Sequence, residues 1–288
     1  MTPMTPVPGR HHDASPCSLP GFTAGSATPS RIWDYWLGGK DNFAADRAVA
    51  DAVAQALPVI PAVARQTRQF LASAVQLLAR DHGIRQFLDI GAGLPTACNT
   101  HEVAQRVAPS SRVVYVDHDP VVLTHARALL TSGPQGRVAC LQADIRDTAT
   151  ILADAARTLD FTHPTAVLLL AVLHFIPGAD DPHAVVKRLM GAMAPGSFLL
   201  VVHGANDILP GHVAEALRRY NDMSAEPLTL RSRAEIAGFF EGLTPIGPGV
   251  QAPAAWEQFL GGDMGRFPEL PCYAGIGRKP GARGNDAS

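Results

Sequence analysis

The sequence predicts an α/β protein built on a mostly parallel β-sheet with helices on both faces. Three observations support this fold class. Short apolar runs alternate with helical patterns along most of the chain, the runs are continuously apolar, and acidic residues stand at the ends of several of them. Continuous apolar runs are typical of strands buried on both faces, and the intervening helices provide the crossovers that parallel strands need.

The strand and helix order follows directly from these patterns. Strands are predicted at residues 87–91, 112–117, 138–144, 166–176 and 197–203. Helices are predicted between them at residues 98–107, 119–130, 147–159 and 182–193. The pattern then loosens, with helices expected at 208–220 and 232–240 and a closing pair of strands at 243–250 and 272–277.

The chain outside the sheet divides by composition. Residues 1–28 are rich in proline and are expected to form a disordered arm, and residues 281–288 a C-terminal tail. Residues 29–280 are expected to form a single domain. Within it, residues 29–80 are a helical N-terminal section and residues 84–280 the sheet core.

The N-terminal section begins with a short helix rich in aromatic residues. Ser30 is its expected N-cap, and Trp33, Tyr35 and Trp36 lie within it. So many aromatic side chains on one short helix need a surface to cover. The helix is either a lid over a ligand, with Tyr35 contacting that ligand, or a cap on the core. Two further helices are expected at residues 41–57 and 58–80.

Composition narrows the functional classes. The net charge of −2 gives no basic footprint for nucleic acid or an anionic membrane. The most apolar run, residues 166–176, is shorter than the roughly 20 residues that span a bilayer. The four cysteines are far apart, which predicts reduced thiols in a cytoplasmic protein and no metal site. The sequence assigns no oligomeric state.

The most informative stretch is residues 87–96, Phe-Leu-Asp-Ile-Gly-Ala-Gly-Leu-Pro-Thr. Gly91 and Gly93 end a strand in a tight turn, and Pro95 suits the first turn of a following helix. In a parallel sheet this turn lies at the carboxyl end of a strand, where ligands bind. An ordinary turn without a ligand is the alternative.

Two ligand classes use such a turn. Dinucleotides favour a third glycine, where this chain has Thr96. S-adenosylmethionine carries an amino group and a sulfonium but no phosphate, so the carboxylate of Asp89 beside the turn favours it over a pyrophosphate.

Two more acids follow the next strands. Asp117 ends one strand and is suited to accept hydrogen bonds from both hydroxyls of a ribose. Asp144 follows the next, where it is suited to accept from an adenine amino group while Ile145 covers the ring. Each acid has an alternative role as a turn or cap residue, but together they predict one nucleoside site.

These segments resemble a known enzyme class. Leu-Asp-Ile-Gly-Ala-Gly, Val-Tyr-Val-Asp and Gln-Ala-Asp-Ile are similar to the successive cofactor-binding segments of class I S-adenosylmethionine-dependent methyltransferases. Residues 31–43, 87–96 and 171–177 resemble, more narrowly, a bacterial family of such proteins that was long catalogued as a domain of unknown function. The resemblance covers roughly residues 29–280.

The resemblance implies a Rossmann-like sandwich whose seven-stranded sheet ends in an antiparallel strand. It also implies that S-adenosylmethionine is the cofactor. The implied set comprises Asp89, Gly91 and Gly93 at the methionine part, Asp117 at the ribose, and Asp144 with Ile145 at the adenine. His118, which follows Asp117, is a further cofactor-binding candidate, and Tyr35 is a candidate to contact cofactor or substrate from the N-terminal helix.

The methyl acceptor is expected to be a small metabolite. His174, after the strand predicted at 166–176, is the candidate general base, or else a histidine held by hydrogen bonds at a strand end. His203 is a second candidate. Two alternatives to a methyltransferase stay open: a cofactor-binding regulator without turnover, and a nicotinamide-dependent dehydrogenase.

Overall fold

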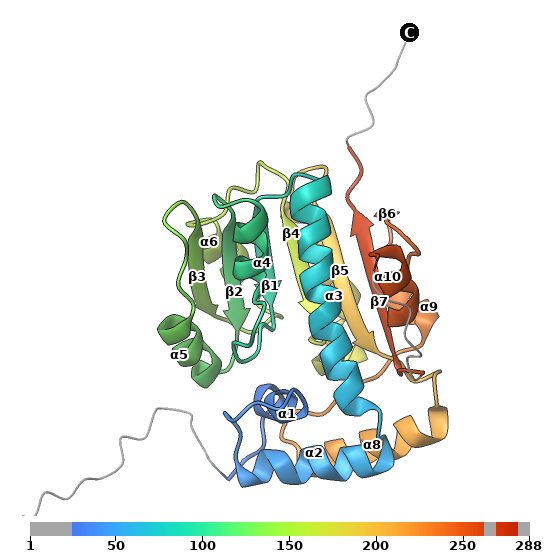
Figure 1. Cartoon of the computed structure of the whole chain (residues 1–288). Helices are drawn as coiled ribbons and strands as arrows, with labels where there is room; N and C mark the ends of the chain where they lie inside the picture. The colour runs from blue at the N-terminus through green and yellow to red at the C-terminus, as the bar shows by residue number, and fades with distance from the viewer. Residues whose placement is uncertain (1–24, 262–268, 282–288) are drawn as a thin grey trace, which may run out of the picture.

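The computed structural model describes residues 25–261 and 269–281 of the chain. A twisted sheet forms its centre, and helices cover both faces of that sheet (Figure 1). The strands are β1 (Gln86–Ile90), β2 (Arg112–Asp117), β3 (Arg137–Gln142), β4 (Ala166–Leu170), β5 (Phe198–Gly204), β6 (Thr244–Pro245) and β7 (Cys272–Arg278). The fold is therefore the α/β class that the strand–helix rhythm predicts.

The strand order is β3-β2-β1-β4-β5-β7-β6. Strands β1 to β5 run parallel, and β7 runs antiparallel to β5 from Cys272, paired with Gly204, to Arg278, paired with Phe198. The expected seven-stranded sheet with an antiparallel last strand is confirmed. Because β1 and β4 are neighbours whose connections leave in opposite directions, their carboxyl ends form the switch point where parallel sheets bind ligands.

Two apolar layers hold helices against the sheet. On one face, side chains such as Phe87, Leu168 and Phe198 pack against Phe70 and Trp256. This face carries α3 (Ile60–Asp81), α4 (Thr100–Val107), α5 (Pro120–Leu129) and α10 (Pro253–Phe259). The opposite face carries α6 (Thr148–Ala155), α7 (Pro182–Ala192) and α9 (Arg233–Gly238). Strand residues point alternately to the two faces, so a continuously apolar strand serves both layers.

Three helices form a separate group beyond the carboxyl ends of the parallel strands (Figure 1). They are α1 (Pro29–Trp36), α2 (Ala44–Ala56) and α8 (Pro210–Met223). Their apolar faces pack together in a third cluster. A buried ion pair joins Arg31 of α1 to Asp46 of α2, with Nε and Oδ2 2.9 Å apart. The cluster and this pair fix α1 above the strand ends.

The loop after α1 explains the Gly-Gly pair of the N-terminal motif. Asp34 accepts hydrogen bonds from the backbone N–H of Asp41 at 2.9 Å and from the side-chain amide of Asn42 at 2.8 Å. A Cβ at Gly39 would overlap the Asp34 carboxylate. Glycine is therefore required there, so that the loop can fold back onto the buried acid.

Several predicted boundaries were wrong. The strand predicted at 166–176 ends at Leu170, because the chain then turns into a 3-10 helix, η1 (Leu173–Phe175). The helix predicted at 98–107 starts at Thr100, where Asn99 and Glu102 form a capping box. Thr28, not Ser30, precedes α1. A second 3-10 helix, η2 (Gly178–Asp180), precedes α7. The predicted strand 243–250 shrinks to the two residues of β6.

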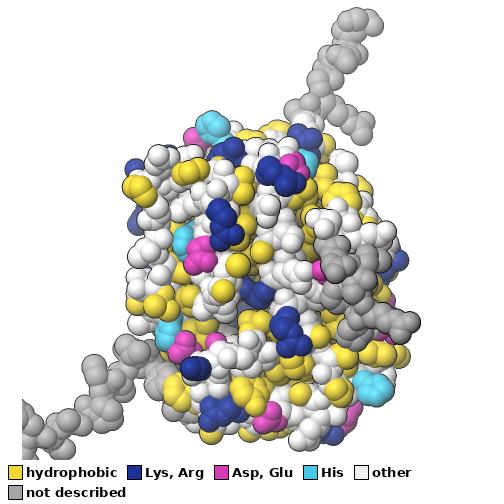
Figure 2. Space-filling view, viewed as in Figure 1, with side chains coloured by type: hydrophobic (Ala, Val, Ile, Leu, Met, Phe, Trp, Pro, Cys, Tyr) yellow, Lys and Arg dark blue, Asp and Glu magenta, His cyan; other side chains and the backbone are white. Residues whose placement is uncertain are grey.

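The surface carries no continuous basic stripe on the face shown in Figure 2, where acidic and basic side chains are interspersed. Of the helices in residues 25–261 and 269–281, no single one is long and apolar enough to cross a membrane; α2 and α3 pass the same test only as a pair, across a bend of 103°. Residues 1–24 of the predicted arm and residues 282–288 of the predicted tail lie outside the described residues.

Candidate active site

A cavity of about 700 Å³ lies between the carboxyl ends of β1, β2 and β4 and the helices α1, α2 and α8. Ligand pockets typically measure about 300–1,000 Å³. The sheet side of the cavity carries Asp89, Gly91, Gly93 and Asp117. The structure thus brings these predicted residues together at the switch point of the sheet.

The turn after β1 is shaped by its two glycines. Gly91 and Gly93 adopt positive φ angles of 74° and 67°. A Cβ at Gly91 would lie 2.6 Å from Val172, whereas the position of a Cβ at Gly93 is free of contacts within 4 Å. Gly91 is therefore required by both backbone and packing, and Gly93 leaves open space facing the cavity.

Asp117 is buried at the end of β2. Its Oδ2 accepts from the backbone N–H of Gly93 at 3.0 Å, and its Oδ1 accepts from that of Asp119 at 3.0 Å. Burial raises the pKa of Asp117, and these two backbone bonds oppose the rise. Each carboxylate oxygen has two lone pairs, so both oxygens keep room for a ligand hydroxyl.

His118 stands at the mouth of the cavity. Its Nε2 lies 3.2 Å from the carboxylate of Glu226, in the loop after α8. The hydrogen bond to Glu226 raises the pKa of His118 to about 9, so the imidazole is a cation at neutral pH. The pair joins the sheet side of the cavity to its helical side.

Asp89 is paired with a residue that the sequence did not single out. Asp89 accepts from the Thr100 hydroxyl at 2.6 Å, and burial raises its pKa to about 6. The Arg68 guanidinium, from α3, opposes that rise by its charge. Arg68 also lines the cavity, and its Nε is buried without a hydrogen-bond partner. A free N–H on a cation beside the glycine turn suits a ligand carboxylate.

Asp144 and Ile145 lie on the same wall of the cavity. Both Asp144 oxygens accept hydrogen bonds from the Arg146 guanidinium, at 2.9 and 2.6 Å, and these bonds lower the pKa of Asp144. Arg146 also reaches Asp180 at 3.1 Å. Asp144 is therefore a charged carboxylate shared with an arginine, a partner that the sequence pattern did not reveal.

His174 lines the cavity from η1, and its Nδ1 is buried without a partner. Burial lowers its pKa well below the usual 6.5, and competition with protonation of His203 and the charge of Arg231 act in the same direction. The imidazole is thus neutral at pH 7. His203 is different: its Nδ1 donates to the Gly204 carbonyl at 2.8 Å, and its Nε2 accepts from Arg231 at 2.9 Å. Both its nitrogens are used, and it does not line the cavity.

Tyr35 does not reach the cavity. Its hydroxyl lies 3.1 Å from Asp51 on α2, and the aromatic residues of α1 that line the cavity are Trp33 and Trp36. Successive helix residues are turned by about 100°, so positions 33 and 36 share a face that position 35 leaves. The ligand contact expected of Tyr35 thus has no support in the structure.

In the described part of the chain, the buried polar side-chain atoms that lack a hydrogen-bond partner belong to residues that line the cavity. Among the described residues, three buried side-chain atoms have no hydrogen-bond partner: Arg68 Nε, His174 Nδ1 and Tyr220 Oη. All three residues line this cavity. Buried polar groups are normally paired, so three orphans around one space indicate a site built for a polar ligand. The cavity offers a cation for the carboxylate of S-adenosylmethionine, acids for its amino group and hydroxyls, and an apolar wall. This set of groups fits that ligand.

The comparisons with known proteins agree with this geometry. Residues 21–280 match the family model described as S-adenosyl methyltransferase. No curated protein matches the chain. A crystal structure of a DUF574 family protein from Streptomyces avermitilis is 41% identical, covering 88% of this chain and 98% of that one with a TM-score of 0.84. A candidate methyltransferase from Thermobifida fusca YX is 39% identical, covering 89% and 96% with a TM-score of 0.79.

A more distant structure shares the fold alone. It is the plantazolicin methyltransferase BpumL in complex with S-adenosylhomocysteine, 11% identical, with coverage of 87% and 95% and a TM-score of 0.52. The family match decides against the dehydrogenase and against a binding protein without turnover. The chain belongs to the S-adenosyl methyltransferase family and is an enzyme that takes its methyl group from S-adenosylmethionine.

Proposed function

We propose that the cofactor lies along the sheet side of the cavity and that the enzyme methylates a small metabolite held on the helical side. The single observation that carries this proposal is the position of Arg68. Its unpartnered Nε lies in the cavity that the glycine turn also lines. In this arrangement Arg68 binds the cofactor's carboxylate, and Asp89 accepts from its amino group.

The other cofactor residues follow from their places on the cavity wall. Asp117 accepts from the ribose hydroxyls, with His118 beside it. Asp144 accepts from the adenine amino group, sharing its charge with Arg146, and Ile145 covers the ring. Gly91 and Gly93 let the backbone approach the methionine part. All these residues line one cavity, which supports a single elongated ligand.

When bound, S-adenosylmethionine supplies a methyl group on a sulfonium that is already electrophilic. The chain's own residues then act mainly by positioning and by excluding water. The helices α1, α2 and α8 cover the strand ends, and Ser30 of α1 donates to Asp119 at 3.3 Å. His174, neutral and with a free Nδ1, is the proposed proton acceptor.

A small-molecule acceptor is supported by the enclosed cavity and by the net charge of −2, which gives no attraction for nucleic acid. We also propose that residues 29–280 act as one domain and that the enzyme works in the cytoplasm. The latter is supported by Cys98, Cys140 and Cys272, the described cysteines, which are unpaired.

The test is a calorimetric titration with two ligands. S-adenosylhomocysteine carries the amino-acid part, whereas 5′-methylthioadenosine has the same nucleoside without it. Arg68→Met is expected to weaken S-adenosylhomocysteine binding by about 10- to 100-fold, because a charged hydrogen bond is lost, and to leave methylthioadenosine unchanged. Arg65→Met, an exposed position on the same helix, is the matched control. Equal losses for both ligands, or no loss, would overturn the placement.

A further inference from the structure

The helical side of the cavity is a chamber with apolar walls. Its lining residues come from α1, α2, α3, α8 and η1 and include Trp33, Leu57, Ile60, Val63, Phe175 and Val213. None of these side chains carries a charge or a strong hydrogen-bonding group apart from the indole N–H. A molecule that fills this space must therefore present a largely apolar body.

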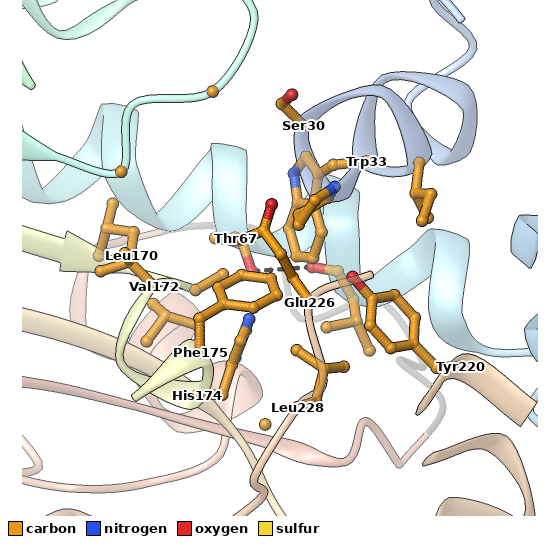
Figure 3. A pocket seen from close by; sticks show the side chains of 18 of the residues that line it. Ser30, Trp33, Thr67, Leu170, Val172, His174, Phe175, Tyr220, Glu226 and Leu228 are labelled. Atoms are coloured by element: carbon orange, nitrogen blue, oxygen red, sulfur yellow. Dashed lines mark hydrogen bonds between the residues drawn. The ribbon is translucent and has the colours of Figure 1, made fainter. Parts of the chain in front are cut away.

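Two of the three orphan polar atoms belong to this chamber. Tyr220 of α8 is buried, and its hydroxyl points toward the space that Thr67 and Phe175 also face (Figure 3). His174 approaches the same space from beneath Phe175, its ring 4.6 Å from that of Phe175. The Thr67 hydroxyl is already used, because it donates to the Val63 carbonyl at 3.0 Å. Ser224 lies close enough to Tyr220 to oppose the rise that burial causes in the pKa of the Tyr220 hydroxyl, but no hydrogen bond of normal geometry joins the two side chains. Tyr220 Oη and His174 Nδ1 thus remain the groups available to a ligand.

The charges around the chamber favour an uncharged acceptor over an ionic one. Two acids line its helical side. Asp34 is occupied by Asp41 and Asn42, and Glu226 is paired with His118. An ammonium group would therefore meet only acids whose charge is already shared with a partner. The cations of the cavity, Arg68, Arg146 and His118, lie on the cofactor side or at the mouth, so a carboxylate would find none in the chamber.

We propose that this chamber binds the methyl acceptor, and that the acceptor is an uncharged hydroxyl compound with an apolar ring body, held by Tyr220 Oη and His174 Nδ1. The proposal rests on the cofactor placement above. Tyr220 donates to the acceptor's hydroxyl oxygen, and His174 accepts its proton. The hydroxyl oxygen forms the new bond to the methyl carbon as the carbon–sulfur bond breaks. The bonding pair stays on sulfur, and the hydroxyl proton passes to His174.

The test uses three probes of matched shape: 2-naphthol, 2-naphthoate and 2-naphthylmethylammonium. Ligand-observed NMR titrations of the full chain, with and without saturating S-adenosylhomocysteine, give their dissociation constants. 2-Naphthol is expected to bind at least tenfold more tightly than either ion. Tyr220→Phe is expected to weaken naphthol binding by about five- to tenfold, the effect of one hydrogen bond, and to leave S-adenosylhomocysteine binding unchanged.

The control is Tyr273→Phe, a tyrosine that does not line the cavity and whose loss is expected to change neither ligand. Leu228→Trp, at a half-buried loop position of the chamber, provides a second variant and is expected to abolish naphthol binding alone. Equal binding of the three probes, or naphthol binding unaffected by both variants, would overturn the proposal. If S-adenosylhomocysteine does not bind the unmodified protein, the proposed cofactor placement is wrong. The titrations of the three probes without S-adenosylhomocysteine still show whether the chamber binds an uncharged hydroxyl compound.

Discussion

The backbone N–H of Gly93 donates to Oδ2 of Asp117 at 3.0 Å, so the side chain that ends β2 holds the turn that follows β1. The other oxygen of Asp117 is held by the N–H of Asp119 at 3.0 Å. The carboxylate is thereby fixed in orientation before any ligand arrives. Gly93 and Asp117, which are proposed to bind different parts of the cofactor, thus form one rigid unit. A substitution at either residue should therefore displace the other.

The two glycines of this turn are expected to differ in their sensitivity to substitution. Gly93→Ala adds a Cβ into open space, so only the left-handed backbone opposes it, at about 1–2 kcal/mol. Gly91→Ala adds the same strain and also places a Cβ 2.6 Å from Val172. Overpacking costs about 1–3 kcal/mol more. Denaturant unfolding of both variants measures the difference, and equal losses of stability would mean that Val172 moves aside.

Cofactor affinity is expected to fall in acid because of Asp89. Burial raises its pKa to about 6, so the carboxylate is charged above pH 6 and neutral below it. Only the charged form attracts the ammonium of S-adenosylhomocysteine. Its dissociation constant should therefore rise as the pH falls below about 6, by up to about tenfold per pH unit. Calorimetry from pH 5 to 8 measures this.

Two controls isolate Asp89. Methylthioadenosine lacks the amino group of the amino-acid part, so its affinity should not follow the same curve. Asp89→Asn should bind S-adenosylhomocysteine weakly at every pH. A curve that persists in Asp89→Asn would assign the effect to another group.

His174 is expected to stay neutral throughout the physiological range. Its pKa lies well below 6.5 because the ring is buried, because a second proton would compete with protonation of His203, and because the charge of Arg231 repels it. NMR spectra of the imidazoles should show no titration of His174 between pH 5.5 and 8. A His174→Gln variant identifies the signal. Titration of His174 near pH 6.5 would show that its ring is reached by water.

The His118–Glu226 pair is expected to stabilise the protein in a defined pH window. The folded-state pKa of His118 is raised to about 9, chiefly by the Glu226 hydrogen bond, above an unfolded value near 6.5. The contribution is therefore complete below pH 6.5 and is lost as the pH rises to about 9. Because His118 is half exposed, we expect about 0.2–1 kcal/mol.

Glu226→Gln measures that contribution. The difference in unfolding free energy between this variant and the unmodified protein should shrink as the pH rises from 6.5 to 9. Glu269→Gln, an exposed acid that does not line the cavity, is the control. A difference that is constant with pH would mean that the pair does not form in solution.

Much of the fold and of the sheet side of the site follows from local sequence pattern. Asp89, Asp117 and Asp144 each stand at or just after the end of a short apolar strand, and parallel strands bring such ends together. The start of the helix predicted at 98–107 is set by a local signal: Asn99 and Glu102, three residues apart, form a capping box, so the helix begins at Thr100.

The helical side could not be predicted in the same way. Arg68 lies within the helix expected at residues 58–80, but the sequence does not say which polar residue of a helix faces a cavity. Tyr220 lies at the end of the helix predicted at 208–220, in the least regular part of the pattern. Its role depends on contacts with segments more than a hundred residues away. Tyr35 and Trp33 are both aromatic and two positions apart, and the helical phase turns Trp33 toward the cavity and Tyr35 away from it.

The most direct test of the cofactor site is the affinity of Asp117→Ala for S-adenosylhomocysteine, measured by calorimetry beside the unmodified protein. Asp160→Ala, an exposed acid outside the cavity, is the control, and circular dichroism checks folding. We predict a loss of about 10- to 100-fold for Asp117→Ala, because its charged acceptors for the ribose are removed, and no loss for the control. An unchanged dissociation constant in a folded Asp117→Ala protein would contradict the site described here.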